Sequence, residues 1–240
     1  MKAWRRFVSK VREVGLLYAL ELTAERLVPR ILFDLRAVYL CQLALGSSLG
    51  APPRERHIHL AEPEELERLM RHHDVLHGMG EKLGPGVKLW VWGEGDQIDA
   101  FMWLDSQVIR PSDWVRLELS EHEIAGVYVW VSPERRGAGL GPRVNRQVSH
   151  ECAQAGYVRI ISTVDLLNRN SLRADEKVGY ERIGKVFVWR ILGFGGIFCR
   201  GMARLGWWTS KHPLALPVDT IERSLRQPTG RGAPRLDAGT

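Results

Sequence analysis

Val127-Tyr-Val-Trp-Val-Ser-Pro-Glu-Arg-Arg-Gly-Ala-Gly-Leu-Gly141 is the most informative stretch of this sequence. It predicts a buried strand that ends at Pro133, a glycine-rich turn, and a helix that begins in the turn. The first amide groups of such a helix have no partner within it and lie at the positive end of its dipole, so they bind phosphate. Arg135 and Arg136 add positive charge. Three glycines leave the backbone open to a phosphate: Gly137, Gly139 and Gly141.

The spacing of this turn separates it from other phosphate-binding loops. It lacks the Lys-Ser/Thr ending of a P-loop, and the first half of the chain offers no βαβ unit for a dinucleotide site. Arg136-x-x-Gly139-x-Gly141 resembles the Arg/Gln-x-x-Gly-x-Gly/Ala signature of the GNAT acyltransferase superfamily, which holds the pyrophosphate of acetyl-coenzyme A. From the residues alone, the alternative is a tight connection between strand and helix with no ligand.

A second segment lies at the expected distance after the turn. Asn168-Arg-Asn-Ser171 and Glu176-Lys-Val-Gly-Tyr180 resemble the Asn-x-x-Ser/Ala and Glu-Lys-x-Gly-Phe/Tyr pattern of the same superfamily. The physical interpretation agrees, because this segment suits a short amphipathic helix with Gly179 as its left-handed cap, followed by a closing strand at 180–189. The resemblance covers about residues 57–195.

The resemblance implies an α+β fold, with a mixed but mostly antiparallel sheet flanked by helices, and the apolar period near the N-terminus adds a helical extension. It implies direct transfer of an acyl group from acetyl-coenzyme A, as cosubstrate, to an acceptor that is usually a primary amine. The strand before the loop would pair with the pantetheine arm and polarise the thioester carbonyl by a backbone N–H. The cofactor-binding residues implied are Val129, Trp130, Val131, Arg136, Gly137, Ala138, Gly139, Leu140, Gly141, Asn168 and Ser171.

The chain departs from the superfamily at Asp175, where many relatives carry a Tyr that protonates the departing thiolate. An aspartate with its ordinary pKa near 4 is ionised at neutral pH, so we expect Asp175 not to be the acid. Tyr180, Tyr128 or solvent are the alternatives. Candidates for the general base precede the central strand, and their alternative interpretation is an exposed turn: Glu118, Glu121, His122 and Glu123.

Composition limits the remaining possibilities. The net charge of +6 and a pI near 9.5 suit a polyanionic cofactor, although they would equally suit nucleic acid or an anionic membrane. The cations are dispersed and no recognition motif accompanies them, so we expect no nucleic-acid partner. The three cysteines lack metal-ligand spacing, and the pair His73 and His77 has no third ligand, so we expect a reduced cytoplasmic chain without a metal.

The ends of the chain lie outside the region of resemblance. We assign 1–50 to an N-terminal extension, 57–195 to the acyltransferase domain, 196–226 to a packed extension and 227–240 to a flexible tail. Apolar residues recur at helical spacing near the N-terminus among Arg and Lys, which suits docking onto the domain or, as the alternative, a peripheral membrane contact. No signal peptide or spanning helix is expected, and an oligomer stays open.

The remaining segments suggest the order of elements. A strand at 58–60, a helix at 63–73, a hairpin of 87–92 with 97–104, and strands at 114–119 and 124–131 are expected. A helix at about 140–155 and a strand at 158–164 follow, and 35–44 is either a strand or a buried helix. Residues 191–216 suggest a packed irregular extension.

Three functions compete on this sequence. The leading one is an N-acetyltransferase that acts on a primary amine of a small metabolite, for instance an amino sugar. The second is transfer of a longer acyl chain at a membrane surface. The third is a non-catalytic acyl-coenzyme A-binding protein, for which the Asp at position 175 is the main support.

Overall fold

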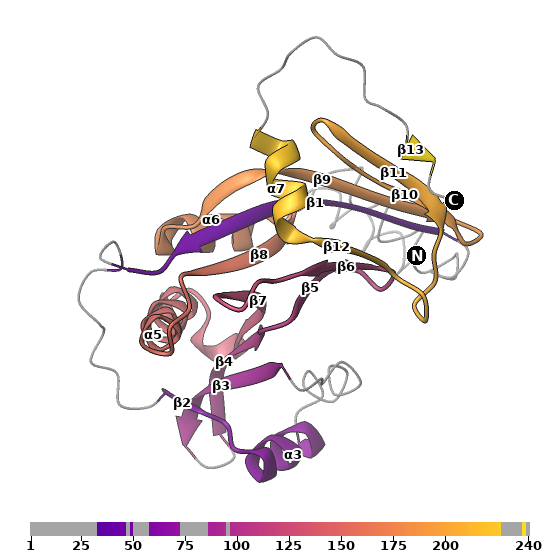
Figure 1. Cartoon of the computed structure of the whole chain (residues 1–240). Helices are drawn as coiled ribbons and strands as arrows, with labels where there is room; N and C mark the ends of the chain where they lie inside the picture. The colour runs from indigo at the N-terminus through magenta and orange to yellow at the C-terminus, as the bar shows by residue number, and fades with distance from the viewer. Residues whose placement is uncertain are drawn as a thin grey trace, which may run out of the picture.

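The computed structural model describes residues 33–46, 49, 58–72, 86–94, 97–226 and 237–238. Within these residues one large mixed sheet carries helices on its faces, and a small three-stranded sheet packs beside it (Figure 1). Most strand pairs are antiparallel, so the α+β prediction is confirmed. Three earlier expectations fall on residues outside this description: the N-terminal helix, the His73 and His77 pair, and nearly all of the tail.

The large sheet has the order β13-β11-β10-β9-β1-β8-β7-β4-β3-β2. Its strands are β1 (Phe33–Ala44), β2 (Ile58–Leu60), β3 (Val87–Glu94), β4 (Gln97–Asp105), β7 (Glu123–Val131), β8 (Arg159–Asp165), β9 (Glu181–Ile191), β10 (Phe194–Cys199), β11 (Met202–Trp207) and β13 (Asp237–Ala238). Two pairs are parallel, β7 with β8 and β11 with β13. The β3–β4 hairpin is antiparallel, as the sequence predicted.

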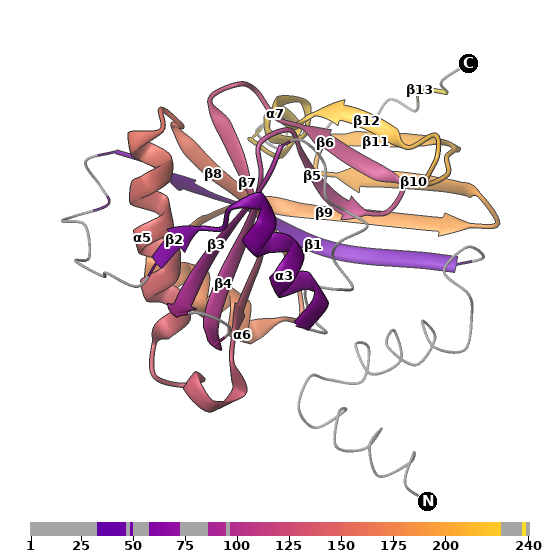
Figure 2. The ribbon, with the colours of Figure 1, turned by 90° about the horizontal axis from the view of Figure 1, so that it is seen from below.

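The apolar segment at 35–44 is strand β1, and it lies in the middle of the sheet. It pairs antiparallel with both β8 and β9, with a register shift between Leu40 and Cys41. Leu40 and Cys41 are almost fully buried, as expected for a strand covered on both faces. Part of the segment assigned to the N-terminal extension thus holds together the two halves of the sheet that follow it in sequence (Figure 2).

The expectation of an irregular segment at 191–216 is wrong. Residues 194–207 form the β10–β11 hairpin, and β12 (Leu214–Pro217) pairs in parallel with β6 (Val115–Glu118). Glycines in this segment permit close packing. A Cβ on Gly195 would lie 2.4 Å from the carbonyl oxygen of Trp189, and one on Gly196 would lie 2.7 Å from Leu205.

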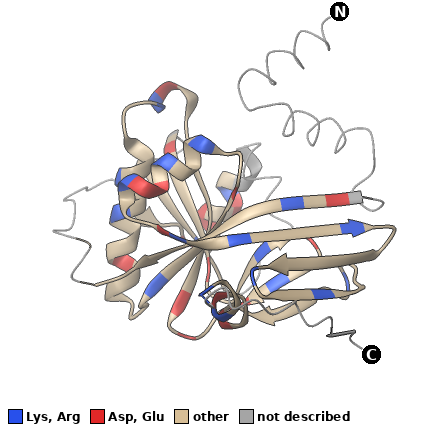
Figure 3. Cartoon of the chain, turned by 90° about the horizontal axis from the view of Figure 1, so that it is seen from above, with Lys and Arg blue, Asp and Glu red and all other residues tan. Residues whose placement is uncertain are grey.

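Four helices of the described residues complete the fold: α3 (Pro63–His72), α5 (Leu140–Gln154), α6 (Arg169–Val178) and α7 (Val218–Arg226). Helix α5 buries Val144 and Val148 against the sheet, whereas α7 buries Val218 and Ile221 on a second cluster that includes β5 (Val108–Ser112). No described helix combines the length and apolarity that crossing a membrane requires. Basic and acidic residues are interspersed along the ribbon (Figure 3).

Candidate functional site

The site begins where two parallel strands separate. β7 pairs with β8 from Glu123 to Gly126, and the last pair joins Gly126 to Ser162. Beyond it β7 continues to Val131 beside β4 alone, so the edge that faces β8 is left without a partner strand. An edge of this kind offers backbone N–H and C=O groups to an extended ligand, which can bind as an added strand.

The glycine-rich turn stands at the far end of that edge. A 3₁₀ turn at Pro133–Arg135 leads into α5, whose N-cap is Gly139. Gly137 and Gly139 have φ values of 83° and 75°, a left-handed conformation that other residues rarely adopt. Because a glycine N-cap has no side chain, the first amide groups of α5 face outward uncapped, as an anion site requires.

The two arginines of the turn are both tied to the strands. Arg135 Nε lies 3.2 Å from Asp99 Oδ1, and Arg136 Nε donates to the carbonyl of Val131 over 3.2 Å. These contacts hold the turn against the ends of β4 and β7, and they keep two positive charges beside the open amides of α5.

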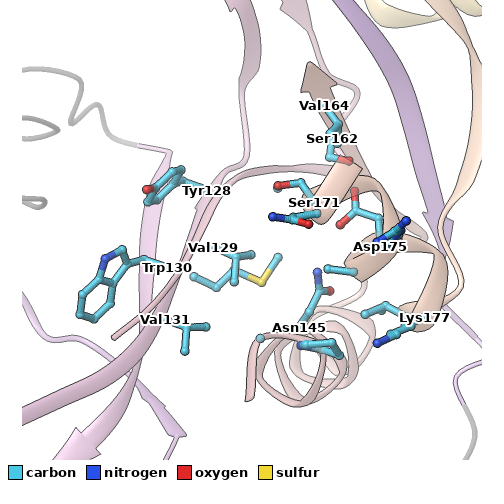
Figure 4. Close-up of a pocket in the computed structure, with 18 of the residues that line it drawn as sticks. Tyr128, Val129, Trp130, Val131, Asn145, Ser162, Val164, Ser171, Asp175 and Lys177 are labelled. Carbon is cyan, nitrogen blue, oxygen red and sulfur yellow. The ribbon is translucent and has the colours of Figure 1, made fainter. Parts of the chain in front are cut away.

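A cavity of about 740 Å³ joins the open edge, the turn and α6. It is lined by all the cofactor-binding residues expected from the sequence except Ala138, and also by Tyr180. In Figure 4 the strand Tyr128–Val131 stands on one side, whereas Ser162, Ser171 and Asp175 gather on the other. Trp130 turns away from the cavity to stack on Phe101, so its contribution here is its backbone.

Helix α6 brings the second sequence motif to the cavity. Asn168 is its N-cap, and the side-chain oxygen of Asn168 accepts a hydrogen bond of 3.1 Å from the Ser171 amide. Gly179 ends the helix in the left-handed conformation with φ 109°, as the sequence predicted. The motif therefore fixes the start and the end of α6, and one side of this short helix lines the cavity.

Asp175 and Tyr180 face the same cavity with altered acidities. Burial raises the pKa of Asp175 to about 6, so the assumption of an ordinary value near 4 is corrected, although the carboxyl is still mostly ionised at pH 7. Burial, and then the charge of Asp175, raise the pKa of Tyr180, which keeps its phenol neutral. The Tyr180 hydroxyl donates a hydrogen bond to Asn145 Oδ1 over 3.4 Å. A Cβ placed on Gly126 would lie 3.7 Å from the Tyr180 hydroxyl oxygen. The hydroxyl thus lies where the strands separate.

The four expected bases lie elsewhere, and Glu121 and His122 are exposed in the turn before β7. Glu118 is exposed on β6 and does not line the cavity. Glu123 is 3% exposed and contacts Arg159, which also pairs with Glu222 at 2.8 Å. The Ser120 amide donates to Glu123 as well. These contacts give Glu123 a structural role at the start of β7, because its carboxylate is already occupied.

Two buried polar residues of the cavity were missed in the sequence. Asn145 is 5% exposed and lies four residues after Gly141, so a polar residue on the apolar face of α5 was the available signal. Ser162 is 8% exposed, and its Oγ has no hydrogen-bond partner among the described residues. No local signal marks it, because its position depends on the separation of β7 from β8.

The described residues contain no cluster of His, Cys, Asp or Glu suited to a metal ion. Cys41, Cys152 and Cys199 are free thiols. Burial raises the pKa of Cys41 and of Cys152 to about 12, so both stay protonated, and neither lines the large cavity.

Comparison with known proteins agrees with this geometry. The sequence model of one family, described as "Acetyltransferase (GNAT) family", matches residues 55–180. No curated protein matches the chain.

Solved structures of similar fold include a GNAT-family protein from Novosphingobium aromaticivorans, 15% identical, with a TM-score of 0.48 over 65% of this chain and 63% of that chain. Another is a GCN5-related N-acetyltransferase from Sphaerobacter thermophilus, 16% identical, with a TM-score of 0.43 over 70% and 55%. A third, an aminoglycoside N-acetyltransferase in complex with CoA, is 16% identical with a TM-score of 0.40 over 52% and 91%. The alignments thus span less than two thirds of the first two chains.

Proposed function

The chain belongs to the acetyltransferase (GNAT) family, and we propose that it transfers an acetyl group directly to a primary amine of a small metabolite. Acetyl-coenzyme A is the cosubstrate of this family. One observation carries the proposal: the open edge of β7 and the uncapped start of α5 line the same cavity. The pantetheine arm would lie along Val129–Val131, and the pyrophosphate at Gly137–Gly141.

The reaction has two requirements that the chain's residues can meet, which are stabilisation of the carbonyl oxygen and protonation of the sulfur. The neutral amine nitrogen bonds to the thioester carbonyl carbon, the C–S bond breaks, and sulfur takes the electron pair. The nitrogen then gives up one proton, which balances the proton that sulfur receives. Backbone N–H groups on the open edge would stabilise the negative charge that develops on the carbonyl oxygen. Tyr180 would supply the proton to sulfur, because its neutral hydroxyl lies where the strands separate.

A covalent acyl-enzyme is not required by this arrangement. The buried thiols of Cys41 and Cys152 stay protonated and lie outside the cavity lining. Direct transfer from the thioester to the amine therefore fits the described residues better than transfer through a cysteine.

Asp175 supports a second candidate, a protein that binds acyl-coenzyme A without turnover. A carboxylate on the wall of the cavity repels a departing thiolate, and its pKa of about 6 leaves it mostly charged at neutral pH. If the second candidate is correct, coenzyme A binds but no amine is acetylated.

The deciding experiment measures thiol release from acetyl-coenzyme A, and from longer acyl donors, against a panel of small amines. Turnover with acetyl-coenzyme A that falls about 10- to 100-fold in Tyr180→Phe, with unchanged coenzyme A affinity, supports the proposal. Tyr157→Phe is the matched control, because Tyr157 does not line the cavity. Tight coenzyme A binding without thiol release from any combination of acyl donor and amine would establish the non-catalytic alternative.

A further inference from the structure

A second cavity, of about 310 Å³, meets the first where β7 and β8 separate. Val127 and Thr163, the residues that directly follow the last β7–β8 pair, line both cavities. Successive residues of a strand point to opposite faces of a sheet, and Met102 lines the first cavity whereas Trp103 lines the second. The two cavities therefore lie on opposite faces and meet at Val127 and Thr163, where the strands separate.

Two buried polar groups on the wall of the second cavity lack partners. Trp103 is 3% exposed and Ser112 is 8% exposed, yet neither Trp103 Nε1 nor Ser112 Oγ has a hydrogen-bond partner among the described residues. A buried donor without a partner is costly, so such groups generally serve a bound molecule or ordered water. The indole N–H can only donate, and it therefore calls for a ligand atom that accepts.

The charged residues of this cavity are held in fixed positions. Asp34 accepts from Trp114 Nε1 over 2.9 Å and pairs with Arg36 at 3.3 Å. Asp105 is 3% exposed, accepts from the Gln107 and Val108 amides, and pairs with Arg110 at 2.9 Å. These contacts hold both carboxylates in place on the wall.

The balance of charge favours a cation. Three carboxylates line the cavity, on Asp34, Asp105 and the exposed Asp113, against two guanidinium groups, on Arg36 and Arg110. The net charge is therefore one negative, which suits a ligand with a single ammonium group. The volume is at the lower end of the range for small-molecule sites, so a long chain or a folded partner would not fit.

We propose that this second cavity binds the acetyl acceptor, and that the acceptor is a small primary amine that also carries a hydroxyl or carbonyl oxygen. The acceptor's oxygen accepts a hydrogen bond from Trp103 Nε1 and forms a second hydrogen bond with Ser112 Oγ. The amine of the acceptor faces the gap at Val127 and Thr163. The proposal rests on the proposed function, because the amine reaches the thioester only through that gap. The ammonium first releases one proton to solvent, and the neutral nitrogen then displaces sulfur from the acetyl carbon.

Calorimetric titration of coenzyme A-saturated protein with matched amines tests this assignment. Glucosamine is compared with cyclohexylamine, and ethanolamine with propylamine, so that each pair differs mainly in oxygen. We expect at least one oxygen-bearing amine to bind roughly 10- to 100-fold more tightly than its partner. Trp103→Phe and Ser112→Ala should each reduce that preference, because each removes one polar group and little volume.

Trp90→Phe is the matched control, since Trp90 is half-buried and lines neither cavity. If Trp103→Phe fails to fold, Ser112→Ala carries the comparison. Equal binding within both pairs, no binding by any of the four amines, or a preference that survives Trp103→Phe and Ser112→Ala would overturn the assignment. Binding that depends on Trp103 without thiol release would leave the cavity assignment intact and defeat the proposed function instead.

Discussion

At the scale of single residues, Asp175 is where this chain departs most from its superfamily. The sequence suggested an ordinary exposed carboxylate, whereas the structure places it on the cavity wall with a raised pKa. Its neighbour Tyr180 is neutral and lies at the strand separation. In the function proposed above, Tyr180 would donate the proton, whereas the burial of Asp175 has a cost in stability that can be measured.

That cost appears in the pH dependence of stability. The folded pKa of Asp175 is about 6, above the ordinary value of 3.8. At pH values between these two pKa values, the folded chain therefore binds more protons than the unfolded chain. The contribution of Asp175 is therefore most favourable below pH 4 and is lost as the pH rises through 6. Asp175→Asn removes this loss, and we expect it to raise the free energy of unfolding by about 1–2 kcal/mol at pH 7, after allowance for partial exposure.

Urea unfolding of Asp175→Asn and the parent chain at pH 4, 5, 6 and 7 checks this expectation. The difference should be small at pH 4 and grow towards pH 7. Glu176→Asn is a suitable control, because Glu176 is exposed on the same helix. A constant difference at all four pH values would mean that Asp175 titrates normally.

At the scale of elements, local signals predicted well and long-range pairing did not. The β3–β4 hairpin, α5 and the capped helix α6 each carry their own turn, cap or period, so the sequence indicated them closely. The place of β1 depends on pairs such as Cys41 with Ser162, which are remote in sequence. The second cavity likewise depends on β1, β4 and β5 meeting, and no motif encodes that meeting.

Arg159 links several of these elements from the start of β8. Its guanidinium contacts Glu123 on β7 and Glu222 and Asp219 on α7, and it donates to Gln42 on β1 over 3.2 Å. Glu123 and Glu222 are 3% and 7% exposed. Removal of the cation would leave two buried carboxylates without their main partner.

We therefore expect Arg159→Met to lower the free energy of unfolding by about 3–5 kcal/mol. Arg116→Met, at an exposed position of β6, should change it by less than about 0.5 kcal/mol. Glu123→Gln should also be destabilised, yet any folded fraction should keep its turnover, because Glu123 lies outside the cavity. A well-folded Glu123→Gln that loses turnover with intact coenzyme A binding would restore Glu123 as a base.

At the scale of the whole molecule, one face of the extended sheet is unusually apolar. By register, Leu35, Phe187, Ile191 and Trp207 lie on the same face of β1, β9 and β11, and each is at least 42% exposed. A continuous apolar surface of this kind is typical of an interaction site. The amphipathic N-terminal segment, which lies outside the described residues, comes before β1 in the sequence.

The N-terminal segment can dock on the protein or attach to a lipid surface, and we expect docking on the protein. The intact chain should then stay in the supernatant with anionic vesicles at both low and high salt, and removal of residues 1–22 should be destabilising. Vesicle co-sedimentation measures this directly. Binding at low salt that is lost at high salt, and that needs residues 1–22, would favour the membrane alternative.

The central claim is that the cavity between β7 and β8 holds coenzyme A by the start of α5. Gly139→Val tests it, because a branched side chain would block the uncapped amides, and its left-handed backbone costs about 1–2 kcal/mol. Gly156→Val is the matched control, since Gly156 has φ 90°, open space around it and no place in the cavity.

Calorimetric titration of coenzyme A into both folded variants is therefore the most direct measurement. The account predicts parental affinity for Gly156→Val and a loss of at least about 100-fold for Gly139→Val, equivalent to two or more lost charge-assisted hydrogen bonds. Unchanged affinity in a folded Gly139→Val protein would contradict it.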